Sequence, residues 1–316
     1  MYWKNDWQTY GYDGDVNQKI KPHPTAVIHF DIKKTITRPI KTYSEELLLN
    51  AQAITERFPG THDLMLSGGV DSEIVLRCHK ILNIPINVFV AKYTEGVNEL
   101  DFYQAMETCR IYDVTPTIID IDLRKFYESG EAYDFYSIVP VHKAGDLIHL
   151  KIISMLDNMP IMADGINIDS CRYDSSAGPW RIAFMEKYWH TTLYGNAIDR
   201  PIITKWHDYS PELTMSILNF DLIEINHMHP PPWTPDRMEQ LKYIMNNHHL
   251  GVRIRNKLGG CEGNSFKSDY LPPEQGGLLY PEYMRNFPQT DPSHVWFNNQ
   301  RFSNYEWTIQ EFKELM

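Results

Sequence analysis

The stretch LMLSGGVDSEIVL, from Leu64 to Leu76, most constrains what this chain can fold into. Its short apolar start is typical of a buried strand, and from Ser72 onward it has the apolar spacing of an amphipathic helix. Between them lie Gly68 and Gly69, which let the backbone turn tightly and bring several N–H groups close to an anion. A helix N-terminus adds further donors and a partial positive charge. The stretch therefore predicts a strand-loop-helix unit whose loop binds phosphate.

Asp71 needs a separate explanation, because a carboxylate in this loop would repel a bare phosphate. A Mg²⁺ ion between Asp71 and the phosphate oxygens would remove that repulsion. The alternative is a plain strand-to-helix turn in which Asp71 caps the helix. The full string from Ser67 to Ser72, with both hydroxyls available as donors, favours the phosphate cradle.

The loop stands within a regular alternation of short apolar runs and amphipathic segments. Ser44 is placed to cap the first helix of this series. Such alternation predicts an α/β fold with a parallel sheet and helices on both faces, whose ligands bind beyond the carboxyl ends of the strands. We expect strands at 63–66, 86–91, 116–122 and 160–164, and helices at 44–58, 72–82, 98–112 and 146–158.

The chain divides into three expected parts. Residues 1–43 contain one plausible strand, TAVIHFDI, and are interpreted as an N-terminal extension or hairpin. Residues 44–205 form the parallel-sheet domain. In residues 206–316 helices remain readable at 211–220 and 235–248, but proline-rich runs such as HMHPPPWTP are irregular. We expect this part to be a mainly helical, loop-rich lobe that closes over the nucleotide side of the sheet.

The string SGGVDS resembles the S-G-G-x-D-S loop of the PP-loop ATP pyrophosphatase superfamily, which includes asparagine synthetase, NAD synthetase, GMP synthetase and several tRNA-modifying enzymes. The resemblance implies an adenine nucleotide alpha hydrolase-like fold. It also implies cleavage of ATP between the α and β phosphates, with AMP placed on a substrate oxygen. The loop has no G-K-[ST], so γ-phosphoryl transfer of the P-loop kinase type is not expected.

Within that superfamily, roughly residues 44–205 look most like the synthetase (C-terminal) domain of asparagine synthetase. VFVAKYTEGVNELDFYQAMETC resembles that family's second strand and a helix opening with N-E-x-D-x-A. PIMADGINIDS falls where the family has G-[DE]-G-x-D-E, and Asp164 and Gly165 match its first acidic-glycine pair. Asn167 departs from the family's magnesium-binding aspartate, although Asp169 follows two residues later.

The resemblance implies ATP and Mg²⁺ as cofactors, with a small carboxylate as the substrate and ammonia or an amine as the acceptor. Asp71, Asp164 and Lys257 are the expected catalytic residues, and Asp71 and Asp164 the expected metal ligands. Lys187 and Lys205 are the other candidates for a cation on pyrophosphate. The expected nucleotide-binding residues are Leu66, Ser67, Gly68, Gly69, Val70, Asp71, Ser72, Val90, Ala91 and Gly165.

Bulk properties limit the partners. The formal net charge of −11 counts against a broad electrostatic grip on nucleic acid. The polar, aromatic start is unlike a signal peptide and no apolar run is long enough to span a bilayer, so we expect a cytoplasmic protein without a membrane partner.

Glutamine-using asparagine synthetases carry an N-terminal cysteine nucleophile. Here Tyr2 follows Met1, so the nitrogen is expected to come from ammonia, another amine or a separate glutaminase.

Two alternative functions stay open. The first is a tRNA- or nucleobase-modifying adenylating enzyme. The second, suggested by Asn167, is a catalytically weakened nucleotide-binding protein. Cys261 is a rival catalytic residue, whereas Cys78 and Cys109 are interpreted as core. Trp180, Trp189 and Trp206 are interpreted as lobe core rather than a base-stacking platform. A conceivable metal cluster is formed by His227, His229, His248 and His249.

Overall fold

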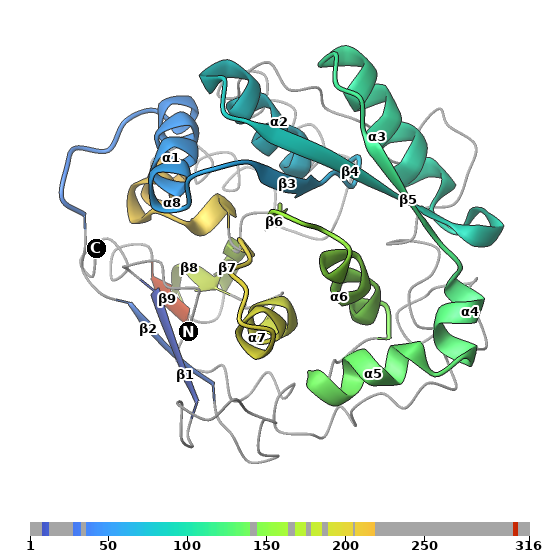
Figure 1. Cartoon of the computed structure of the whole chain (residues 1–316). Coiled ribbons are helices and arrows are strands. Elements are labelled where there is room, and N and C mark those ends of the chain that lie inside the picture. The colour runs from blue at the N-terminus through green and yellow to red at the C-terminus, as the bar shows by residue number, and fades with distance from the viewer. Residues whose placement is uncertain are drawn as a thin grey trace.

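A four-stranded parallel sheet forms the centre of the computed structural model (Figure 1). Its strands, in the order β5-β4-β3-β6, are Thr117–Ile121, Ile86–Tyr93, His62–Met65 and Met159–Met162. β3 is central, since His62 lies opposite both Ile86 and Met159. The structure describes residues 8–12, 28–32, 36–139, 144–163, 168–174, 178–184, 189–204, 206–218 and 306–308.

Helices cover both faces of this sheet, as the alternating pattern predicts (Figure 1). Consecutive residues of β4 point into two different cores. Val88 and Val90 are buried in one, while Phe89 and Ala91 pack against the other. On the first face lie α1 (Tyr43–Arg57), α2 (Val70–Leu82) and α3 (Glu99–Ile111), and on the second α4 (Leu123–Glu128), α5 (Glu131–Ile138), α6 (Asp146–Ser154) and α7 (Trp189–Ala197). The α/β fold is therefore confirmed.

The start of α1 differs from the sequence expectation. Its N-cap is Thr42 rather than Ser44. The Thr42 hydroxyl accepts a hydrogen bond from the Glu45 N–H, and the Glu45 carboxylate accepts one from the Thr42 N–H. This reciprocal capping box requires a glutamate three residues after the cap, a spacing that Thr42 satisfies.

Helix α2 begins at Val70, two residues earlier than expected, so Asp71 and Ser72 belong to its first turn. Helix α6 ends at Ser154 rather than Asn158. The N–H groups of Asp157 and Asn158 instead donate to the Asp63 carboxylate at 3.1 and 2.7 Å, which turns the chain into β6. A 3₁₀ turn, η1 (Thr94–Gly96), joins β4 to α3.

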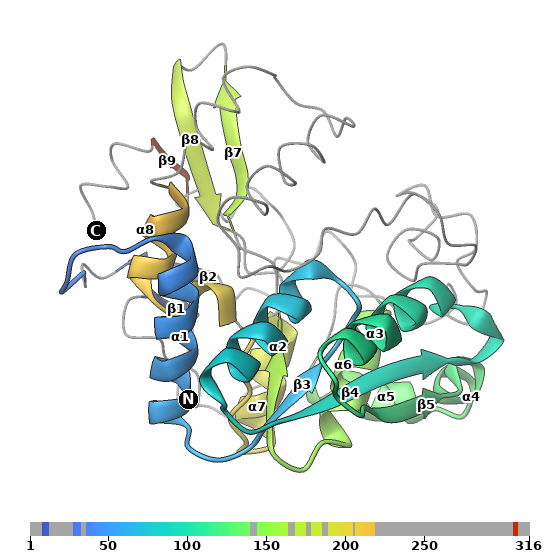
Figure 2. The ribbon, with the colours of Figure 1, turned by 90° about the horizontal axis from the view of Figure 1, so that it is seen from above.

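Two smaller sheets accompany the parallel one. β1 (Gln8–Tyr12) pairs antiparallel with β2 (Ile28–Ile32), in agreement with the strand expected near the N-terminus. An antiparallel sheet of β7 (Ile168–Asp174), β8 (Gly178–Phe184) and β9 (Glu306–Thr308) was not expected from the sequence. Figure 2 shows β7 and β8 projecting away from the parallel sheet.

The chain after α7 returns to the parallel sheet. Ile203 bridges Ile161 of β6, with Ile203 N–H donating to the Pro160 carbonyl at 2.8 Å. The turn η2 (Trp206–Asp208) and helix α8 (Pro211–Leu218) follow, and α8 packs on α1 (Figure 1). The helix expected at 235–248 lies outside the described residues, and the division of the chain into three parts stays a prediction. Within the described part, no helix is long and apolar enough to cross a membrane.

Candidate functional site

The loop after β3 is built by short local hydrogen bonds. Leu66 N–H donates to the Phe89 carbonyl at 2.9 Å, which prolongs the strand pairing by one residue. The Ser72 hydroxyl donates to the Gly69 carbonyl at 3.0 Å and accepts from the Ser67 N–H at 3.3 Å. Ser72 is buried and shapes the loop from inside, whereas Ser67 is exposed. Of the two serine hydroxyls expected to donate to phosphate, Ser67 is the one at the surface.

Gly68 is held in close contact with α3. Its φ is +74°, a value that glycine adopts without steric cost. A β-carbon at this position would lie 2.5 Å from the Asp101 carbonyl oxygen, 2.8 Å from the Ala105 nitrogen and 2.9 Å from the Gln104 Cβ. The position therefore requires glycine twice, for the turn and for the approach to α3. The sequence predicted only the turn.

A distant histidine contacts the start of α2. Nε2 of His207 lies 3.2 Å from the Asp71 carbonyl oxygen. A carbonyl only accepts, so Nε2 carries the hydrogen in this contact. His207 is 1% exposed in η2, and the preceding Trp206 carbonyl accepts from Asn50 Nδ2 at 2.6 Å. These contacts link η2 to α2, the helix that follows the loop, and to α1. Trp206 is itself fully buried, and the core that it joins is the one between the parallel sheet and helices α1 to α3 rather than the expected lobe core.

A pocket lies beside the loop at the carboxyl ends of β3 and β4, the edge where ligands of parallel sheets bind. It brings together Leu66, Ser67, Val90 and Ala91 from the predicted nucleotide-binding set. Three further polar lining residues, Asn98, Asp101 and His149, are not among the predicted site residues. The remaining lining residues are Met65, Phe89, Tyr93 and Ile152.

Asn98 fixes the wall of this pocket. Its Oδ1 accepts from the Tyr93 N–H at 2.8 Å and its Nδ2 donates to the Ala91 carbonyl at 2.9 Å. Asn98 is 6% exposed, so these bonds are shielded from water. The Asn98 side chain thereby fixes the carboxyl end of strand β4 to the residue just before α3.

Two cysteines behave as expected. Cys78 and Cys109 are buried in the core between the sheet and helices α1 to α3. Burial raises the pKa of the Cys78 thiol, so the reactive thiolate form is suppressed.

Several predicted residues cannot be placed with the loop. Asp164, Gly165, Asn167 and the three candidate lysines, Lys187, Lys205 and Lys257, lie outside the described residues. The same holds for Cys261, His227, His229, His248 and His249. Asp169 lies in β7, and Trp180 and Trp189 lie in β8 and α7.

No protein-family model matches the chain, and no curated protein matches it significantly. Solved structures similar to it include an NMN synthetase from Francisella tularensis, with 14% identity, a TM-score of 0.30, and coverage of 68% of this chain and 96% of that one. The NH3-dependent NAD synthetase from Campylobacter jejuni is similar at 16% identity and a TM-score of 0.30, covering 61% of this chain and 97% of that one. A protein from Methanocaldococcus jannaschii described as a "predicted subunit of tRNA methyltransferase" has 17% identity and a TM-score of 0.29, with coverage of 59% and 86%. Because these TM-scores are low, the fold assignment rests on the sheet itself.

Proposed function

We propose that this chain is an ATP-dependent, AMP-forming ligase of the PP-loop type. It adenylates a small carboxylate and transfers the acyl group to ammonia or an amine, releasing AMP and pyrophosphate. The observation that carries the proposal is the glycine loop at Ser67–Ser72, which ends β3, opens α2 and borders the pocket. Loop N–H groups and a helix N-terminus suit pyrophosphate, and the walls at Val90 and Ala91 suit the adenosine part.

The chemistry explains why ATP is cleaved at the α phosphate. A carboxylate is a poor acyl donor because its leaving group would be oxide, and adenylation replaces that group with AMP. The loop binds the departing pyrophosphate and lowers the cost of the charge that develops on it. Lys257 is proposed to add a cation there, with Lys187 and Lys205 as alternatives. The amine or ammonia then attacks the activated carbonyl.

The loop also fits a magnesium ion. Asp71, half-buried in the first turn of α2, offers carboxylate oxygens, which are ligands that Mg²⁺ prefers. Asp164 is the second proposed ligand. When bound, Mg²⁺ supplies positive charge to the phosphate oxygens. Asparagine synthetase-like specificity, in which the substrate is a small acid, rests on the sequence resemblance.

The decisive experiment measures the products formed from α-labelled ATP with Mg²⁺, ammonium and a panel of carboxylates. We expect AMP and pyrophosphate that depend on one acid. Asp71→Asn is expected to lower turnover by about 100-fold or more. Asp113→Asn is the matched control, because Asp113 is an exposed aspartate beyond the far end of α3.

Other products would identify the rival functions. ADP and phosphate would overturn the ligase. AMP formation that requires RNA would identify a nucleic-acid-modifying enzyme. ATP binding without turnover would identify a nucleotide-binding protein.

A further inference from the structure

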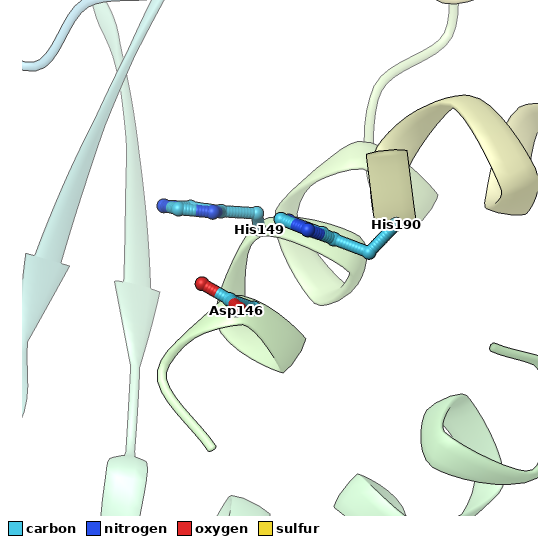
Figure 3. Close-up of side chains that lie close together, drawn as sticks. All are labelled: Asp146, His149 and His190. Carbon is cyan, nitrogen blue, oxygen red and sulfur yellow. The ribbon is translucent and has the colours of Figure 1, made fainter. Parts of the chain in front are cut away.

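Three side chains with metal-binding atoms meet between α6 and α7 (Figure 3). Asp146 and His149 are three residues apart on α6, so they project from the same face of the helix. His190 comes from the first turn of α7. One ligand atom from each residue lies within 4.8 Å of the other two. The imidazole rings of His149 and His190 are nearly parallel, at 15°, with centroids 6.1 Å apart.

We propose that Asp146, His149 and His190 bind a divalent transition-metal ion with the ligand preference of Zn²⁺. Two imidazoles and one carboxylate form a donor set that zinc and its neighbours favour, whereas Mg²⁺ prefers oxygen alone. Bonds of about 2.1 Å to a tetrahedral ion place neighbouring ligand atoms about 3.4 Å apart. The three ligand atoms, which lie within 4.8 Å of one another, would thus draw together by at most about 1.4 Å on binding.

The burial of the three side chains suits a metal site. His190 is fully buried, at 1% exposure, so an ion bound to it would be shielded from water on that side. His149 and Asp146 are half-buried, which leaves the ion a route from solvent.

The position of the cluster links it to the pocket. His149 is both a member of the cluster and a lining residue of the pocket that contains Ser67 and Asn98. Three protein ligands leave one coordination position of a tetrahedral ion open for water or a substrate atom. The ion would thus be at the margin of the ligand site, separate from the magnesium position proposed at Asp71. This inference goes beyond the proposed ligase and does not depend on it.

The test is Co²⁺ binding to the full chain after metal removal, followed by visible absorption. Co²⁺ replaces Zn²⁺ in such sites and reports a low coordination number through strong d–d bands. We expect one site, and we expect Asp146→Asn and His149→Gln each to weaken binding by at least about tenfold. Asp134→Asn is the control, since Asp134 is an exposed aspartate on the neighbouring α5. Circular dichroism checks that each variant is folded.

His149→Cys separates a ligand from a structural histidine. A thiolate at a ligand position adds a sulfur-to-cobalt charge-transfer band in the near ultraviolet, which a cysteine away from the ion does not produce. The band would support the site even if the other variants prove unstable. The proposal is overturned if the wild type binds no Co²⁺ or Zn²⁺. It is equally overturned if the cobalt spectrum is unchanged in Asp146→Asn and His149→Gln. None of these measurements requires ATP turnover.

Discussion

Gly68 lies so close to Asp101 that a β-carbon on the glycine would stand 2.5 Å from the aspartate's carbonyl oxygen. Asp101 belongs to the first turn of α3 and also lines the pocket. The proposed phosphate loop and the adjoining pocket wall are therefore packed as one unit. The shape of the loop depends on α3 as well as on its own two glycines.

Replacing Gly68 tests that packing. Gly68→Ala puts a methyl group into the backbone of α3, where no flexible side chain can yield, and we expect ATP affinity to fall about tenfold or more. Gly130→Ala is the matched control, because Gly130 has a φ of +90° but nothing within 4 Å of its added β-carbon. The control should carry only backbone strain of about 1 kcal/mol. Calorimetric ATP titration and urea unfolding would be compared. Equal losses in both variants would show that the approach to α3 is unimportant.

Asn98 offers a test of the pocket wall. Asn98→Ala removes two shielded hydrogen bonds and leaves the Tyr93 N–H and the Ala91 carbonyl without that partner. We expect the free energy of unfolding to fall by about 1–3 kcal/mol and ATP binding to weaken. Thr94→Ala is the control at the same strand exit, since it removes a single, longer bond of 3.3 Å from Leu123 N–H. If Thr94→Ala matches Asn98→Ala in both measurements, the proposed role of Asn98 is wrong.

The sequence predicted the elements that have a local signature. The apolar run before Ser67, the glycines after it and the helical spacing from Ser72 all lie within a few residues of one another. The alternation of strands and helices along the chain followed from the same periodicity, whereas the order of the strands within the sheet did not. Boundaries moved by a few residues where a local bond decides, as with Thr42 at the start of α1.

Contacts between distant segments had no such signature. His207 meets the Asp71 carbonyl across 136 residues, and nothing in the spacing of either residue points to the other. His149 and His190 are 41 positions apart and are brought together by the packing of α6 on α7. β7 and β8 come shortly after the acidic-glycine pair that the resemblance suggested, and the sequence did not predict them. Polar residues dominate IDSCRYD, the sequence of β7, which therefore lacks the apolar alternation of a strand.

Asp63 allows stability to be separated from function. It is fully buried near the amino end of β3, away from the loop, and its carboxylate accepts from the N–H groups of Asp157 and Asn158 and from Asn87 Nδ2. Asp63→Ala removes a charged acceptor that three partly buried hydrogen bonds share, so we expect a loss of about 3 kcal/mol in the free energy of unfolding. Asp120→Ala, at an exposed aspartate on β5, should change it by less than about 0.5 kcal/mol. Urea unfolding measures both.

ATP affinity should be retained in the folded fraction of Asp63→Ala, because the pocket is at the opposite end of the strand. A small effect on unfolding would mean that solvent replaces the lost acceptor. A loss of ATP binding by the folded protein would contradict the assignment of Asp63 to a purely structural role.

His62 of β3 and His79 of α2 form a buried pair from which we predict how stability depends on pH. His79 is fully buried at the end of α2, with Nδ1 donating to the Val75 carbonyl at 2.9 Å and Nε2 lying 3.2 Å from His62 Nδ1. Burial lowers the pKa of His79 from 6.5 to about 4 and also lowers that of His62. The unfolded chain therefore takes up a proton before the folded chain does as the pH falls.

The sign follows from that order of protonation. The contribution of His79 to stability is complete above pH 6.5 and declines as the pH falls from 6.5 to about 4, by about 3 kcal/mol at most. Urea unfolding at several pH values across this window should show the decline in the wild type. His79→Gln is expected to flatten it, although His62 and His190, whose pKa values burial also lowers, leave part of the slope. Lys80→Gln, at the exposed neighbouring residue, controls for a change of charge at the surface. An identical slope in wild type and His79→Gln would mean that the pKa of His79 does not differ between the folded and unfolded chains. The acid sensitivity would then come from other groups.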